Sequence, residues 1–256
     1  MKTEQYLNYL SIIEKDNLAG IKLLSEEKTE NDLYNSAFRY AIFNAHGDRK
    51  YFRNLLNLWN LRNCKIFKKS KLSIKIHIIS DVTVNMMVDY LKLFFSSYGI
   101  ESEITYSDFN SVENEVYQNH VECDILIFFL SDYWLQNLIN KKKINKEVLD
   151  SVFVYINNLI TEANKKYNVP IFLNSFYDSR WLVDGSLSID TEILSQTTFN
   201  FLLNLKILKS KSKNIKIYNL DNIIRNSGGL ESIGGASFLK MRASLNEFGF
   251  INLSRD

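Results

Sequence analysis

The segment from residue 74 to residue 99, IKIHIISDVTVNMMVDYLKLFFSSYG, constrains the fold of this chain more than any other. It begins with an apolar stretch typical of a buried strand and continues into a short polar turn, Ser80 to Thr83. The apolar residues that follow recur at the spacing of one helix face, and Gly99 is expected to end that helix. A strand, a tight turn and a helix in this order predict one unit of a parallel α/β sheet.

The chain after this unit repeats the alternation of strands and helices. Further strands are predicted at residues 101–106, 124–130, 170–174 and 215–218, with helices at 147–166, at 191–208 and near the C-terminal end. Residues 124–130, DILIFFL, are continuously apolar, as a central parallel strand should be. We therefore predict an α/β fold with three layers, in which helices cover both faces of a parallel, flavodoxin-like sheet.

The first 63 residues show only helical patterns. Apolar residues recur at helical spacing from Tyr6 to Ile13, and again in two later stretches. Residues 64–73 are basic and irregular and are expected to form a linker or an edge strand. We divide the chain into an all-helical N-terminal extension, residues 1–63, and an α/β domain, residues 64–256.

Composition excludes several classes of protein. The formal charge of +2 gives no overall signature of a nucleic-acid-binding protein. No signal peptide is recognised, and the longest apolar run, Ile125 to Leu130, is far shorter than the roughly 20 residues that a membrane helix needs. We expect a cytoplasmic protein without membrane or nucleic-acid partners. Two distant cysteines, Cys64 and Cys123, predict neither a disulfide nor a metal site.

Small polar residues end three of the predicted strands. If the first, third and fourth strands are parallel neighbours, these residues meet at one edge of the sheet, where such folds bind ligands. Helix capping is the competing explanation, because these residue types favour helix N-termini. For the set as a whole we favour a substrate-binding pocket. Its predicted members are Ser80, Asp81, Thr83, Ser131, Asp132 and Asn174.

Ser80 and Asp81 are the only candidate catalytic residues at this edge. A hydroxyl nucleophile needs a base within hydrogen-bond reach. His77 lies three residues before Ser80, on the opposite face of the strand, and no histidine follows His120. A Ser-His-Asp triad of the usual chain order is therefore not expected, whereas a Ser-Lys or Thr-carboxylate arrangement stays open.

Residues 74 to about 246 resemble a known family. The strings IHIISDVT, EITYSDFNSVENEVY, CDILIFFLSD, VPIFLNSFYD and IKIYNLDNIIRNSGG are similar to motifs of the N-terminal, SGNH-hydrolase-like domain of FkbH-type proteins. Members of that family carry a HAD-class domain (subfamily IIIC) and help to load glyceryl units onto acyl carrier proteins. The resemblance implies an SGNH-like α/β fold.

The resemblance also implies roles for individual residues. Some members read Gly-Asp-Ser-Thr where this chain reads Ser80, Asp81, Val82, Thr83, so a valine stands at the place of the catalytic serine. The HAD phosphatase motif is likewise missing, because Asn219 stands where its nucleophilic aspartate would be. The chain is thus expected to be a catalytically impaired, binding version of the fold.

The expected function follows from the resemblance and from the missing catalytic serine. The chain would bind a small acyl or glyceryl group linked to an acyl or peptidyl carrier protein in a natural-product pathway, with a separate HAD-type enzyme as a second partner. No cofactor is expected beyond the phosphopantetheine arm of the carrier. Two alternatives stay open: an SGNH-type esterase or acyltransferase that uses Ser80, and a non-catalytic protein-interaction module. Lysine clusters such as Lys206, Lys209 and Lys213 would attract an acidic carrier.

Overall fold

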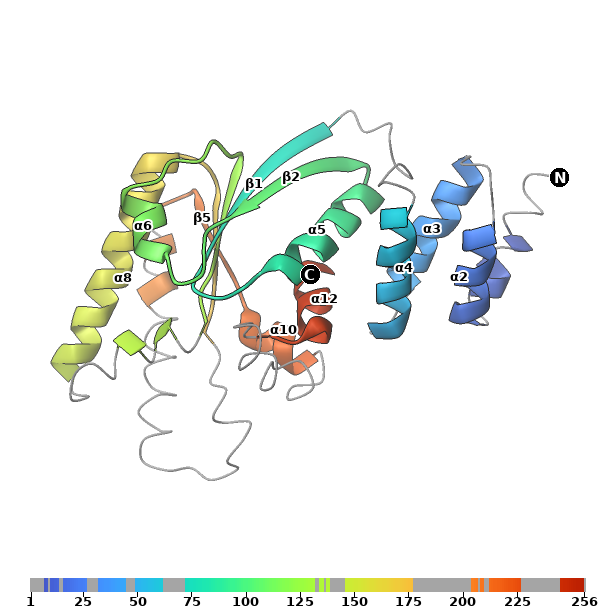
Figure 1. Ribbon diagram of the computed structural model, residues 1–256. Helices are drawn as coiled ribbons and strands as arrows, with labels where there is room; N and C mark the ends of the chain where they lie inside the picture. The colour runs from blue at the N-terminus through green and yellow to red at the C-terminus, as the bar shows by residue number, and fades with distance from the viewer. Residues whose placement is uncertain are drawn as a thin grey trace, which may run out of the picture. The chain divides into compact units, whose positions relative to one another are not determined.

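Figure 1 shows a computed structural model of the protein. The structure describes residues 7, 8, 10–13, 16–26, 32–44, 49–61, 72–131, 134, 135, 137, 138, 146–176, 204–206, 208, 209, 212–226 and 245–255. All structural statements below concern these residues.

The α/β part of the chain is built on a parallel sheet of five strands. The strands run in the order β2-β1-β3-β4-β5, and this order confirms the predicted flavodoxin-like sheet. The first, third and fourth strands are parallel neighbours, as expected, and the register places Ser80 beside Phe129. The strands are β1 (Leu72–Ser80), β2 (Ile100–Tyr106), β3 (Ile125–Phe129), β4 (Ile171–Asn174) and β5 (Ile215–Tyr218).

Helices follow most of the strands. Their bounds are α2 (Asn17–Glu26), α3 (Asp32–Asn44), α4 (Arg49–Leu61), α5 (Asn85–Ser97), α6 (Val112–Tyr117), α8 (Lys146–Tyr167), α10 (Leu220–Asn226) and α12 (Glu247–Arg255). The sequence predicted α5, α8, α12 and the helical N-terminal region, but not the short helices α6 and α10. Most of the helix predicted at residues 191–208 lies outside the described residues.

The chain divides into two compact units. The first comprises residues 1–73, 86–102 and 250–256, and the second comprises residues 74–85 and 103–249. This division is one of contacts in space, and it gives α5 and α12 to the same unit as the N-terminal helices. The domain boundary at residue 63 stays a prediction.

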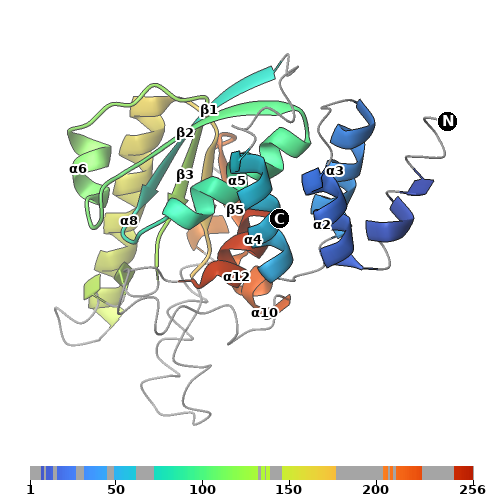
Figure 2. The same ribbon diagram turned by 45° about the vertical axis from the view of Figure 1, so that its right-hand side comes forward.

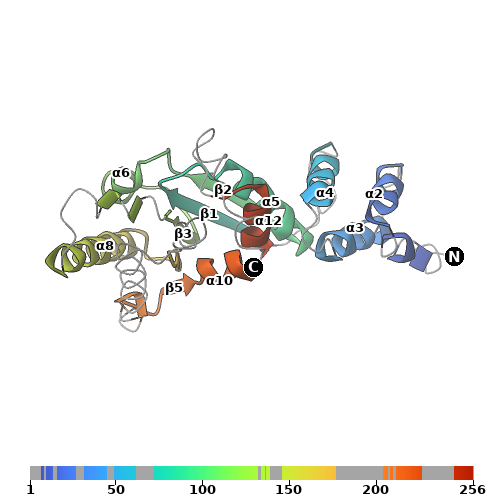
Figure 3. The same ribbon diagram turned by 90° about the horizontal axis from the view of Figure 1, so that it is seen from below.

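The core of the second unit lies between the sheet and the helices α6 and α8. Figures 1 and 3 both show these two helices side by side along one face of the sheet. Apolar residues of α8 recur three or four positions apart, so one stripe of that helix faces the strands. The core members from the strands and the two helices include Ile79, Val112, Val116, Leu126, Phe128, Ile156, Leu159, Ile160, Ala163 and Ile171.

The core of the first unit joins helices from both ends of the chain. In α4, the buried residues Tyr51, Phe52, Leu55 and Leu58 form one helix face. Ile251 of α12 is fully buried in the same cluster, which also contains Phe94 of α5. Figure 2 shows α12 beside α5. The α5 helix ends at Ser97, two residues before the predicted stop Gly99, whose φ of 74° lies in the left-handed region that glycine adopts without strain.

Within the described part of the chain, no helix is both long and apolar enough to cross a lipid bilayer.

Candidate functional site

The hydroxyl of Ser80, at the carboxyl end of β1, is used entirely within the protein. Ser80 is fully buried, and its Oγ donates to the Phe129 carbonyl at 2.7 Å and accepts from the Val82 N–H at 3.1 Å. The Ser80 N–H in turn donates to the Ser107 hydroxyl at 2.9 Å. The Ser80 side chain therefore ties β1 to β3 and closes its own turn, and it does not face solvent as a nucleophile would.

The carboxylate of Asp81 connects the same two strand ends. Asp81 is 3% exposed, and it accepts the Ser131 N–H at 2.7 Å and the Ser131 hydroxyl at 2.5 Å. The Ser131 Oγ also accepts the Trp134 N–H at 3.2 Å, three residues further on, which is the bond of a helix N-cap. Ser131 thus begins the helical turn after β3, and Asp81 holds Ser131 in place from the neighbouring strand.

The amide of Asn174 makes a third connection of this kind. Its Oδ1 accepts the Leu130 N–H at 2.8 Å, and its Nδ2 donates to the Leu130 carbonyl at 2.7 Å. Asn174 is fully buried, so this side chain supplies both partners that the Leu130 backbone requires after the ladder between β3 and β4 has ended.

The structure therefore brings four of the six predicted site residues together and shows what each one binds. Ser80, Asp81, Ser131 and Asn174 lie at the carboxyl ends of adjacent strands, and each makes hydrogen bonds with other protein groups. Thr83 is half-buried in the turn, and Asp132 lies outside the described residues. The strand order reverses between β1 and β3, where α/β sheets usually bind ligands, and here the Asp81–Ser131 bonds bridge that point.

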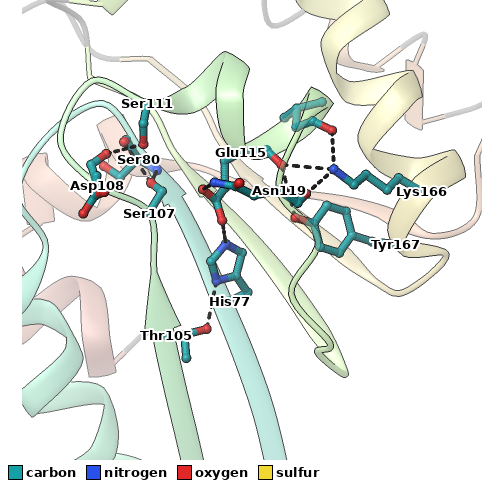
Figure 4. Close-up of polar contacts among 11 residues, drawn as sticks. His77, Ser80, Thr105, Ser107, Asp108, Ser111, Glu115, Asn119, Lys166 and Tyr167 are labelled. Atoms are coloured by element: carbon teal, nitrogen blue, oxygen red, sulfur yellow. Dashed lines mark hydrogen bonds and ion pairs between the residues drawn. The ribbon is translucent and has the colours of Figure 1, made fainter.

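A second polar cluster lies on the face of the sheet that α6 covers (Figure 4). His77, in the middle of β1, is 1% exposed. Its Nδ1 lies 2.8 Å from the Thr105 hydroxyl on β2, and its Nε2 lies 3.0 Å from Glu115 Oε1 on α6. The other oxygen of Glu115 accepts the Asn119 amide at 2.9 Å. A buried carboxylate, an imidazole and a hydroxyl therefore form one continuous chain.

The surroundings of His77 determine whether its imidazole is charged and which ring nitrogen carries the proton. Burial lowers the pKa of His77 below the ordinary range, and the neighbouring Glu115 offsets part of this effect. The neutral imidazole carries one proton. Since a carboxylate only accepts hydrogen bonds, that proton is on Nε2, and Nδ1 accepts the Thr105 hydroxyl.

Other titratable side chains surround His77. The Tyr167 ring of α8 stacks on the imidazole with its centroid 6.4 Å away, and the His120 ring lies 5.5 Å from Tyr167. The thiol of Cys123 is hydrogen-bonded to the backbone of His77, but burial, with Asp124 nearby, raises the pKa of this thiol to about 11. Cys123 is therefore protonated at neutral pH and is not a reactive thiolate.

Lys166 holds α6 against the rest of this cluster. Its Nζ donates to the carbonyls of Val116, at 2.9 Å, and of Asn119, and lies 3.4 Å from that of Glu115. These carbonyls are at the C-terminal end of α6, where a helix leaves its last carbonyls without partners inside the helix. A cation at that position also matches the negative end of the helix dipole.

Asn219, which stands at the place of the nucleophilic aspartate in the HAD motif, has a structural role. Its Oδ1 accepts the Asn222 N–H at 3.0 Å and the Ser175 hydroxyl at 3.3 Å. It therefore caps the start of α10. Within the described ranges, His, Cys, Asp and Glu side chains form no group of three or more that could hold a metal ion.

Comparison with known proteins shows the fold alone. No protein-family model matches the chain. No curated protein matches it by sequence. Among solved structures, it is similar to the N-terminal part of the protein BF1531 from Bacteroides fragilis, which contains a phosphatase domain and was crystallised with Mg. The TM-score is 0.62 at 13% sequence identity, and the match covers 72% of this chain. It spans half of that solved chain.

Sequence reasoning missed the Thr105–His77–Glu115 cluster. His77 had been placed correctly on the face opposite Ser80, toward a helix layer, but its partners lie 28 and 38 residues away. Thr105 was not considered as a site residue, although the alternation of β2 puts it on the same face of that strand as Glu101 and Glu103. The available signal was thus a histidine on a central strand beside a hydroxyl residue on the next strand.

Proposed function

We propose that this chain is a non-hydrolytic, SGNH-like α/β module that binds a carrier protein bearing a small acyl or glyceryl group. The observation that carries the proposal is that the turn after β1 offers no free nucleophile. Val82 is 2% exposed at the place of the family's serine, and the Ser80 hydroxyl beside it is committed to the Phe129 carbonyl. Val82 has no nucleophilic atom, and Ser80 could attack a substrate only by giving up its bond to the Phe129 carbonyl, which favours binding over hydrolysis at this edge.

The structural comparison supports the choice of a second partner. BF1531 contains a phosphatase domain, and a module of similar fold occupies the matched half of that chain. In our proposal a phosphatase-type enzyme supplies the phosphate chemistry, because Asn219 of this chain caps a helix rather than acting as a phosphoryl acceptor. The module itself presents the carrier-linked group.

The test is a calorimetric titration of the full chain with an acyl carrier protein in two forms. One form carries a glyceryl or acetyl group on its phosphopantetheine arm, and the other has no arm. We expect saturable binding of the loaded form, weaker binding of the form without the arm, and lower affinity at high salt, because the carrier is acidic. Equal affinity for both forms would favour the protein-interaction alternative, and no binding of either form would refute the proposal.

Charge reversal tests separately whether the lysine cluster attracts the acidic carrier protein. Lys206 and Lys209 are exposed, so exchanging both for glutamate should slow association about tenfold or more without unfolding the chain. Lys22→Glu is the matched control, because Lys22 is also exposed but lies on α2. If the control slows association as strongly as the double variant does, the cluster has no specific role in carrier binding.

A further inference from the structure

We propose that Thr105 is a nucleophile that accepts an acyl group from an activated ester or thioester, with His77 as its base. This site is separate from the turn after β1 and does not depend on the proposed carrier binding. The arrangement has the parts that nucleophilic catalysis requires: a hydroxyl in contact with a base, and a third group that orients the base. The Thr105 hydroxyl lies 2.8 Å from His77 Nδ1, and His77 Nε2 lies 3.0 Å from Glu115.

The proton positions suit this reaction. Both oxygens of Glu115 accept hydrogen bonds, one from His77 and one from Asn119, so the imidazole is held with its proton toward the carboxylate. The opposite ring nitrogen is then a free base that faces the Thr105 hydroxyl. Burial keeps the imidazole neutral at neutral pH, which is the form that can accept a proton.

Exposure to solvent distinguishes Thr105 from the other two residues of this hydrogen-bonded cluster, His77 and Glu115. His77 and Glu115 are buried, whereas Thr105 is exposed on β2, which is an edge strand among the described strands of the sheet. The carboxylate of Glu115 partners only one nitrogen of the buried imidazole, and the Thr105 hydroxyl partners the other. The exposed hydroxyl is thus directed at the buried base (Figure 4).

The sheet also supplies a donor for the oxyanion. The Ser107 N–H donates to the Ile78 carbonyl, so by the alternation of a parallel ladder the N–H of Tyr106 points away from β1, toward the outer edge. A backbone N–H of the residue directly after the nucleophile is a common oxyanion donor. An extended acyl substrate lying along the edge of β2 would meet both groups.

The reaction balances with the groups present. Thr105 Oγ1 forms a bond to the acyl carbonyl carbon, and its proton moves to His77 Nδ1. The bond from that carbon to the ester oxygen or thioester sulfur then breaks, and the departing alkoxide or thiolate takes the proton from His77. The products are an ester of Thr105 and a free alcohol or thiol.

The experiment uses p-nitrophenyl acetate with the full chain, followed by peptide mapping of the acetylated residue. We expect acetyl transfer to Thr105, lost in Thr105→Val and retained in Thr105→Ser. Valine has the size of threonine and favours strands, so this variant should fold. Thr161→Val is the matched control, because the Thr161 hydroxyl donates only to the Asn157 carbonyl and lies beside no imidazole in the described contacts.

A second variant and a pH profile test the base. His77→Gln should slow acetylation of Thr105 about a hundredfold or more. In the unaltered chain the rate should fall as acid protonates His77, at a pH below the ordinary histidine range. Acetylation confined to lysines, an unchanged rate in Thr105→Val, or no acetylation of the chain would each overturn the proposal.

Discussion

At the scale of single residues, the polar side chains at the strand ends hold the sheet together. Asp81 accepts two hydrogen bonds from buried Ser131, and Asp81→Ala leaves both donors without this partner. We expect the free energy of unfolding to fall by about 2–4 kcal/mol, measured by urea denaturation. Asp108→Ala is the control, because Asp108 is exposed in the nearby loop and should change stability by less than about 0.5 kcal/mol. An unchanged midpoint of urea unfolding for Asp81→Ala would show that the hydrogen bonds between Asp81 and Ser131 contribute nothing to stability.

His77 gives a residue-scale prediction about pH. Its pKa in the folded chain is lowered from the ordinary 6.5, so the unfolded chain binds the proton first as the pH falls. Stability is therefore fully present above 6.5 and decreases below it, by up to about 1.4 kcal/mol per pH unit, until the folded pKa is reached. Denaturation curves at several pH values should show this slope, and His77→Gln should reduce it. An equal slope in both chains would mean that other groups cause it.

At the scale of elements, Lys166 should determine whether α6 stays folded. Lys166→Met removes the donor from the carbonyls of Val116 and Asn119, and we expect a loss of about 1–2 kcal/mol together with faster amide hydrogen exchange in α6. Lys165→Met is a close control, since Lys165 is exposed and pairs with Glu162 on the surface of α8. That surface pair contributes about 0.5 kcal/mol. Equal exchange rates in the two variants would contradict this role of Lys166.

The elements also show where sequence reasoning succeeded and where it failed. The strands and the long helices carry strong local patterns, such as the apolar run of β3 and the Gly99 stop after α5, and both were predicted. The short helix α6 has six residues, and much of its support is Lys166, 50 residues from Val116 along the chain. Short helices of this kind depend on tertiary contacts that local propensity does not encode.

The candidate site shows the same limit. The sequence placed Ser80, Asp81, Ser131 and Asn174 at the ends of strands, because residue type and strand periodicity are local properties, and the substrate-binding role of the group stays a prediction. Their partners were not predicted: Asp81 accepts hydrogen bonds from Ser131, 50 residues later. A strand-end side chain can bind a ligand, cap a helix or hydrogen-bond to the neighbouring strand end. Which of these roles it takes depends on the pairing of β1 with β3, which only the folded sheet defines.

At the scale of the whole molecule, the first unit depends on a helix from the other end of the chain. Ile251 of α12 is fully buried in the core formed with the N-terminal helices. Ile251→Ala should lower the stability of this unit by about 2–4 kcal/mol, observed as an earlier loss of hydrogen-exchange protection in α4 during denaturation. Leu253→Ala, at a half-buried position, should cost less. A larger effect at Leu253 than at Ile251 would contradict the described packing.

The central claim is that the turn after β1 is a structural connection and not a hydrolytic centre. The most direct measurement is treatment of the full chain with a fluorophosphonate ester, followed by mass-spectrometric mapping of every labelled hydroxyl. We expect the peptide containing Ser80 to stay unmodified, because the Ser80 hydroxyl is buried and bonded to the Phe129 carbonyl. Stoichiometric labelling of Ser80 would contradict it and identify an active hydrolase.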